Sequence, residues 1–223
     1  LGPRKAKISP AATCNDTLFT AVSSPYFFVT FLSSIIRLSN FRIIAVFVYT
    51  KKMREIEVKI RVVNFEEIEG KLVARGYKLS EPIDQHDVIY SKKDGAATSI
   101  FKEGRVVIRI RHLKNKIELN LKQQKTSEMD NLEYETEIKD ANVMHQILLT
   151  LGYLPTIEIK KIRRTARVND YSLCLDEVEK LGTFVELEKI ATDNLDPNKV
   201  REELFKELES LGLSRIDEEA RGY

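Results

Sequence analysis

The sequence predicts an α+β protein in which about eight antiparallel strands close into a barrel, with about three helices covering its outer face. The first observation is a recurring alternation of charged and apolar residues, whose period of two is typical of strands. The second is that most of these segments follow one another through short turns, as antiparallel neighbours do. The third is that a sheet of this size removes its exposed edges by closing into a barrel.

The clearest strand is REIEVKIRVV at residues 54–63, near the start of the predicted domain. Its charged residues fall on one face and its apolar residues on the other. A half-buried strand with its charges in water would look the same, so this segment alone indicates no special function. A helix is expected next, from Asn64 as its N-cap to Gly76 as its end. Its apolar stripe is formed by Phe65, Ile68, Leu72 and Val73.

The rest of the chain continues this order of strands and helices. Further strands are expected within residues 77–90, 105–112, 116–124, 131–139, 157–168, 171–178 and 183–190. A second helix is expected over 141–151, and a third from Asp196-Pro197 to Gly212. Short hairpin connections are expected at residues 113–115 and 169–170.

Charged residues recur on one face of at least five of the later segments. These segments are IRIR at 108–111, LNLK at 119–122, EYE at 133–135, IKKIR at 159–163 and LDEVEKLGTFVELE at 175–188. Together with Glu55-x-Glu57-x-Lys59, the motifs and their order resemble the CYTH superfamily, also called triphosphate tunnel metalloenzymes, over roughly residues 53–223. QHDVIY at 85–90 is most similar to the branch that includes the class IV adenylyl cyclases.

The resemblance implies that the charged strand faces line a tunnel inside the barrel, while the apolar faces lie outside beneath the helices. A triphosphate needs several cations around a short rod; arginine offers it bidentate forks and lysine a point charge. The implied substrate-binding residues are Lys59, Arg109, Arg111, Lys122, Lys161 and Arg163. They come from about five strands, which only a closed or strongly curved sheet would aim at one place.

Carboxylates beside a polyanion repel it unless a divalent cation lies between them, and Mg²⁺ prefers oxygen ligands. The resemblance implies a Mg²⁺ or Mn²⁺ site, with Glu55 and Glu57 acting with Lys59 as the catalytic residues. The implied metal ligands are Glu55, Glu57, Glu186 and Glu188, with Glu133 and Glu135 as a further pair that binds a second metal or fixes the basic residues. Glu137 continues the same alternation along the strand. We therefore leave open which of Glu133, Glu135 and Glu137 face the tunnel.

Two reactions fit these residues. A triphosphatase would hydrolyse inorganic triphosphate or a nucleoside or organic triphosphate such as ATP. A class IV adenylyl cyclase would instead form cyclic AMP and pyrophosphate from ATP. A non-catalytic polyphosphate- or nucleotide-binding module would keep the cations but tolerate loss of the carboxylates. We expect the triphosphatase, because the sequence shows determinants for phosphate and metal but none for a base.

Residues 1–52 differ from the rest of the chain. They hold seven Lys or Arg residues and one acidic residue, whereas the remainder is formally −4, so the overall pI of about 8.4 gives no reason to expect a nucleic-acid partner. Residues 18–36 carry no charge and reach the length of a membrane span, but Pro25 and several Ser and Thr residues argue against one. Proteins of the family commonly begin where Met53 stands. We therefore expect residues 1–52 to be a non-native or disordered extension, residues 53–223 to be the functional domain, and no membrane partner.

The cysteine and histidine residues suggest no further site. Cys14 and Cys174 are far apart and lack metal-ligand spacing, and Cys174 is expected to be a buried free thiol. Without a disulfide framework, we expect a cytoplasmic location. His86 is interpreted as a surface or strand-edge residue, and neither His86 nor Asp87 has a partner that the sequence can place. A homodimer is left open.

Overall fold

The computed structural model describes residues 17–24, 27–38, 41–50, 53–92, 101–192 and 195–222, which fall into two units, 1–51 and 52–223. In the first unit, β1 (Thr17–Ser24), β2 (Phe27–Leu38) and β3 (Phe41–Thr50) form an antiparallel sheet. The uncharged segment 18–36 falls mostly within β1 and β2. Within the described residues, no helix has the length and apolar character needed to cross a membrane. Our expectation that this extension is non-native stays a prediction.

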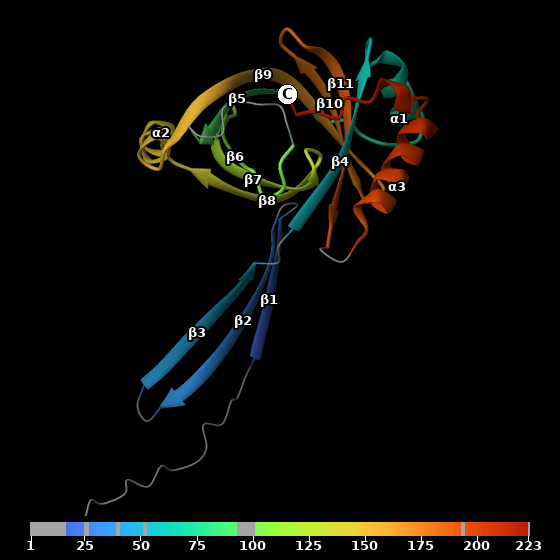
Figure 1. Ribbon diagram of the computed structural model, residues 1–223. Helices are drawn as coiled ribbons and strands as arrows, with labels where there is room; N and C mark the ends of the chain where they lie inside the picture. The colour runs from blue at the N-terminus through green and yellow to red at the C-terminus, as the bar shows by residue number, and fades with distance from the viewer. Residues whose placement is uncertain are drawn as a thin grey trace, which may run out of the picture. The chain divides into compact units, whose positions relative to one another are not determined.

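The second unit is a closed barrel of eight antiparallel strands, which confirms the predicted fold class (Figure 1). In chain order the strands are β4 (Met53–Val62), β5 (Ile83–Lys92), β6 (Val106–His112), β7 (Ile117–Ser127), β8 (Asp130–Ile138), β9 (Tyr153–Val168), β10 (Tyr171–Val178) and β11 (Gly182–Ala191). Around the barrel their order is β10-β11-β4-β8-β7-β6-β5-β9, and β9 pairs again with β10.

Three helices lie against the outside of this barrel: α1 (Glu66–Ala74), α2 (Ala141–Thr150) and α3 (Pro197–Ser210). Figure 1 shows α1 and α3 beside β4 and β11, and α2 next to the N-terminal end of β9. The largest apolar cluster lies between β4, β10, β11 and the helices α1 and α3, and includes Ile56, Val58, Leu72 and Leu204. A smaller cluster joins Leu148 of α2 to β5 and β6.

Local sequence explains where the helices begin. Asp196 accepts a hydrogen bond from the backbone N of Asn198 at 3.0 Å, and Pro197 occupies the first turn of α3. At α1 the prediction was wrong in two details. The N-cap is Phe65 rather than Asn64, because the Asn64 side chain reaches Glu66 N instead of capping the helix. Val73 lies outside the apolar stripe, with 66% of its surface exposed.

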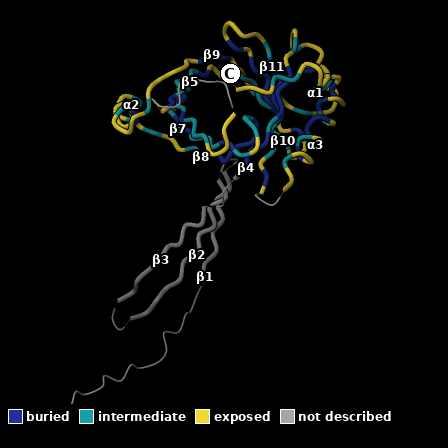
Figure 2. Tube along the Cα trace, viewed as in Figure 1, coloured by how far each residue is buried: buried dark blue, intermediate teal, exposed yellow. Residues whose placement is uncertain are grey.

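Strand β4 is buried on both of its faces. Ile56, Val58 and Ile60 are at most 1% exposed on the helix side, and Glu55 and Lys59 are buried on the interior side. Figure 2 shows this buried stretch where the helices cover the barrel. The fold therefore places the first charged motif in a site that is shielded from water on every side except the barrel interior.

Candidate active site inside the barrel

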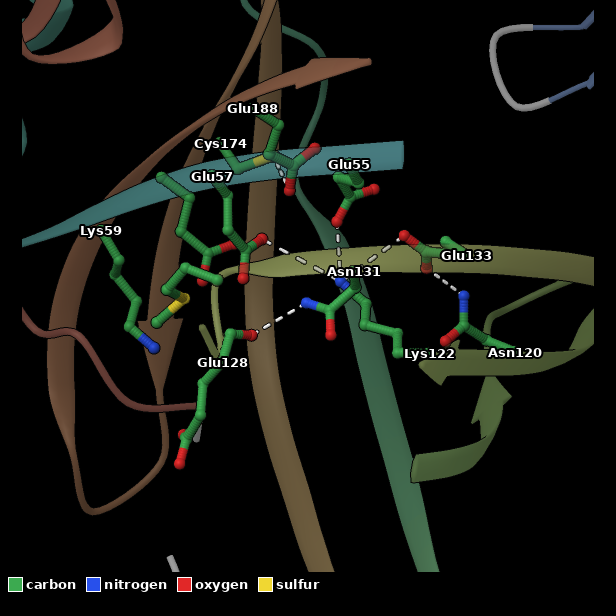
Figure 3. Close-up of polar contacts among 12 residues, drawn as sticks. Glu55, Glu57, Lys59, Asn120, Lys122, Glu128, Asn131, Glu133, Cys174 and Glu188 are labelled. Atoms are coloured by element: carbon green, nitrogen blue, oxygen red, sulfur yellow. Dashed lines mark hydrogen bonds and ion pairs between the residues drawn. The ribbon is translucent and has the colours of Figure 1, made fainter. Parts of the chain in front are cut away.

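Three carboxylates converge inside the barrel from two neighbouring strands. Glu57 of β4 is paired in register with Glu188 of β11, and Glu55 lies two residues along β4 on the same face. Carboxylate oxygens of Glu55, Glu57 and Glu188 all lie within 4.8 Å of one another, and Figure 3 shows the three side chains together. Hereafter we call these residues the acidic triad.

The electrostatics of the acidic triad favour an added cation. Burial is the main cause that raises the pKa of Glu188 to about 7; the charge of Arg163 opposes this rise, and the charges of Glu57 and Glu186 add to it. Crowded carboxylates of this kind cannot all ionise unless positive charge is supplied. An all-oxygen set of ligands is what Mg²⁺ and Mn²⁺ prefer, so the residues present fit the metal that the sequence suggests.

A second group of possible ligands shares Glu188 with the triad. It consists of Cys174 of β10 with Glu186 and Glu188 of β11, again within 4.8 Å of one another. The Cys174 thiol donates to Glu188 Oε1 at 3.9 Å, and burial raises the pKa of the thiol well above its usual value. The prediction that Cys174 is a buried free thiol is confirmed, and its side chain lies among the interior carboxylates.

Lys122 of β7 connects the triad to Glu133 of β8, the strand that lies between β4 and β7. Its Nζ lies 2.7 Å from Glu55, 3.5 Å from Glu133 and 4.0 Å from Glu57 (Figure 3). Although burial lowers the pKa of Lys122, the charges of Glu133 and Glu55 outweigh it and raise the pKa well above its usual value. Burial and the charge of Glu133 raise the pKa of Glu55. Asn120 donates from Nδ2 to Glu133, while its buried Oδ1 has no hydrogen-bond partner among the described residues.

Asp87 of β5 holds two arginines of the neighbouring strand β6. Arg111 donates from Nε to Asp87 Oδ1 at 2.8 Å and from Nη2 to Oδ2 at 2.9 Å, and Arg109 donates from Nη1 to Oδ2 at 3.3 Å. Burial raises the pKa of Asp87, but the hydrogen bond from Arg111 and the charges of both arginines outweigh it and lower the pKa to about 2. One carboxylate therefore serves two cations here.

Asp176 of β10 holds the second pair of cations in a similar way. Arg163 donates from Nε and Nη2 to its two oxygens at 2.6 and 2.5 Å, and Lys161 donates at 2.6 Å. The Arg163 guanidinium also contacts Glu186, and its Nη1 lies 3.7 Å from Glu188. Through Arg163, the cation pair on β9 adjoins the acidic triad.

Lys59, the last residue of the first motif, is bound by the C-terminal segment. Its Nζ donates to the carbonyl oxygen of Arg221 at 2.5 Å, and its own carbonyl accepts from Glu219 N at 2.8 Å. Farther on, Gly222 N donates to Glu128 Oε2 at 3.0 Å, in the turn between β7 and β8. Residues 218–222 thus lie beside β4 beyond its pairing with β8, which covers Met53–Ile56.

The predicted pair Glu133 and Glu135 lies in different surroundings from the acidic triad. Glu133 lies against Lys122 and Asn120, whereas Glu135 is half-buried farther along β8 and Glu137 is exposed. Burial and the charges of Glu118 and Glu133 raise the pKa of Glu135. Neither Glu133 nor Glu135 belongs to a group of three or more described residues whose ligand atoms all lie within 4.8 Å of one another. This placement favours the alternative in which Glu133 fixes a basic residue.

Sequence reasoning missed the two aspartates. The sequence predicts no partner for Asp87 and no role for Asp176, yet each accepts from two of the predicted substrate-binding cations. The alternation itself carries the signal, since Asp176 shares its strand face with the interior residue Cys174. His86 is confirmed as a strand residue on the outer side, where it stacks on His112 and contacts Glu158.

The inner face of this closed barrel carries a carboxylate cluster that could hold a metal ion, next to paired cations that could bind an anion. The chain belongs to the CYTH family, because the CYTH domain matches residues 53–223. A Methanocaldococcus jannaschii protein named "Putative adenylate cyclase MJ0240" is 30% identical over 165 residues, which cover 73% of this chain and 92% of that protein. The resemblance expected from the motifs is confirmed.

Solved structures of archaeal proteins share the fold. A conserved hypothetical protein from Pyrococcus furiosus matches with a TM-score of 0.64 and 26% identity, covering 76% of this chain and 97% of its own. The PH1012 protein from Pyrococcus horikoshii OT3 matches with a TM-score of 0.64 and 27% identity, covering 76% and 96%. The match spans nearly all of each of these proteins and leaves out about a quarter of this chain.

Proposed function

We propose that the protein is a divalent-metal-dependent triphosphatase that binds a triphosphate inside the barrel and hydrolyses its terminal phosphoanhydride bond. The observation that carries this proposal is the direct contact between the two kinds of site. Arg163 belongs to the cation pair held by Asp176 and lies 3.7 Å from Glu188 of the acidic triad. A metal–polyphosphate complex has the charge distribution that such a junction would bind.

The residues divide the chemistry between them. Arginine and lysine side chains bind phosphoryl oxygens and stabilise the charge that develops on them during transfer. The proposed substrate-binding residues are Lys59, Arg109, Arg111, Lys122, Lys161 and Arg163. Glu55, Glu57 and Glu188 would hold Mg²⁺ or Mn²⁺, which when bound supplies Lewis-acid polarisation of the phosphoryl group. Burial of β4 on both faces keeps Glu55 and Lys59 fixed relative to each other.

A class IV adenylyl cyclase is the second candidate. The name of the Methanocaldococcus jannaschii relative and the QHDVIY segment favour it. In that reaction the ribose 3′-hydroxyl attacks the α-phosphate of ATP, and pyrophosphate leaves. The same cations would bind the phosphates in both reactions, so the barrel interior supports either one. For both reactions we propose a cytoplasmic enzyme, in keeping with the free thiol of Cys174.

One assay separates the two candidates. The purified protein is incubated with Mg²⁺ and either inorganic triphosphate or ATP, and the products are separated by chromatography. We expect faster phosphate release from triphosphate than cyclic AMP formation from ATP, because the smallest substrate already engages the metal and cation residues. If ATP yields mainly cyclic AMP and pyrophosphate while triphosphate is untouched, the triphosphatase proposal is wrong and the cyclase replaces it.

A further inference from the structure

We propose that Asp87 is a positioning residue, which holds Arg109 and Arg111 in the orientation in which they receive the phosphoryl oxygens of the substrate. This inference rests on the proposed function, because it assigns a role within the same interior site. It differs from a substrate-binding role, since a carboxylate would repel the phosphate. It also differs from a metal-binding role, since Asp87 belongs to neither group of described residues that could hold an ion.

The geometry of the contact is specific. Asp87 is 2% exposed and meets the Nε–Nη2 edge of Arg111 with both of its oxygens, at 2.8 and 2.9 Å. A guanidinium has five N–H donors in one plane, so this contact commits two of them and fixes the plane of the rest. Arg109 meets Oδ2 of the same carboxylate at 3.3 Å. The directions of both guanidinium groups therefore depend on one buried side chain.

Charge explains why such a residue is needed. Two guanidinium groups on alternate positions of β6 repel each other, and the repulsion is strong where water is scarce. Asp87 between them removes that repulsion and leaves the trio with one net positive charge for an anion. Without it, the long arginine side chains would regain rotamer freedom, and their donors would no longer be aligned with the charge that develops during the reaction. Fixed donors avoid that reorganisation during the reaction.

The same arrangement occurs on the adjacent strands β9 and β10, next to β5 in the barrel. Asp176 meets the Nε–Nη2 edge of Arg163 in the same way and also accepts from Lys161. Each cation pair thus sits on one strand, and its aspartate lies on a neighbouring strand. The repetition indicates that a shared aspartate is the way this barrel fixes adjacent cations, rather than an isolated ion pair.

Asp130 offers a matched control outside this arrangement. It is 0% exposed and accepts from Arg54 Nε at 2.5 Å and Nη2 at 2.6 Å, so its burial and its bidentate contact resemble those of Asp87. Its partner Arg54 is not one of the proposed substrate-binding cations. A change at Asp130 therefore reports what the loss of a buried ion pair does to the fold alone.

The test compares the wild-type protein with Asp87→Asn, Arg111→Ala and Asp130→Asn. Calorimetry in EDTA measures the Kd and stoichiometry of inorganic triphosphate, and kcat per binding-competent molecule is then measured with Mg²⁺ and whichever of triphosphate and ATP the wild type converts. For Asp87→Asn we expect kcat to fall about 10- to 100-fold, with Kd unchanged or lower because a negative charge is removed. Arg111→Ala should raise Kd about ten-fold or more. Asp130→Asn should lower the unfolding temperature and change neither quantity.

The outcomes separate the inference from the proposed function. An Asp87→Asn variant that raises Kd as Arg111→Ala does, or that keeps the wild-type kcat, would overturn the positioning role. If this variant folds too poorly to bind, Asp87→Glu replaces it: the charge is kept but displaced by one methylene, and full kcat would again overturn the inference. A wild type that converts ATP but not triphosphate overturns the triphosphatase alone. A wild type that binds neither substrate overturns both.

Discussion

The acidic triad and the group formed by Asp87, Arg109 and Arg111 are two parts of one barrel interior, and they have opposite electrostatic needs. In the triad, carboxylates crowd together and the pKa of Glu188 is raised to about 7. At Asp87, one carboxylate faces Arg109 and Arg111, and its pKa is lowered to about 2. The first region gains stability from an added cation and the second from an added anion. A single ligand that carries both, such as a metal-bound polyphosphate, satisfies both regions.

The largest expected effect follows from removing a member of the triad. Glu57→Ala should reduce turnover to below about 1% of the wild-type value, because the remaining carboxylates cannot hold the metal as three can. Excess EDTA should do the same to the wild type. Phosphate release is the measurement, with circular dichroism as the check on folding. Glu177→Ala, which changes an exposed carboxylate of β10, is the control. Undiminished activity in EDTA would rule out the metal assignment.

A smaller effect is expected in the cation-rich region. Lys161→Ala should remove charge-assisted hydrogen bonds to phosphate worth about 1.5–3 kcal/mol, and so lower kcat/KM about ten-fold to over a hundred-fold. Lys160→Ala is a matched control, because Lys160 is the adjacent residue of β9 and is exposed on the outer side. Equal effects of the two changes would show that general charge, and not the interior position, controls activity.

The triad should also make the stability of the metal-free protein depend on pH. Glu188 has a raised pKa in the folded state, so its contribution is favourable below the ordinary value of 4.5 and is lost as the pH rises through about 7. The loss is on the order of 3 kcal/mol. In EDTA, Glu188→Gln should therefore unfold at a higher temperature than the wild type at pH 8 but not at pH 5.

Added Mg²⁺ tests the role of Glu188 in a second way. At pH 8 the ion should raise the unfolding temperature of the wild type more than that of Glu188→Gln, because it binds the ionised triad in the folded state. Thermal unfolding followed by circular dichroism measures both effects. Equal unfolding temperatures of the two proteins in EDTA at pH 8 would contradict the raised pKa of Glu188.

The smallest effect is expected from deleting residues 1–52. Neither the triad nor the cation pairs include any of these residues, so the truncated chain should stay soluble and keep its kcat/KM within about two-fold. Steady-state kinetics on the full and truncated chains measure this. Aggregation or loss of activity on truncation would show that the extension is structural.

The barrel could be predicted from the sequence because each strand carries its own alternation of charged and apolar residues. The short connections at 113–115 and 169–170 also identify two pairs of neighbouring strands. The sequence was also sufficient to collect the interior cations, since a closed sheet brings alternate residues of every strand to one space. It could not assign the partners of those cations. Asp87 and Arg111 are 24 residues apart, and their contact depends on the register between β5 and β6, which the period of two leaves undetermined. The position of Lys122 between Glu55 and Glu133 depends on such a register too.

The double burial of β4 has a consequence for attempts to change the substrate preference of this protein. Libraries that randomise β4 would lose most members to misfolding, since every position from 54 to 60 except Glu57 is buried. Strand β7 is more permissive, because Leu119 and Leu121 on its outer face are half-buried under a smaller apolar cluster. A library designed to select for new substrates would therefore randomise β7 first and keep the sequence of β4 unchanged.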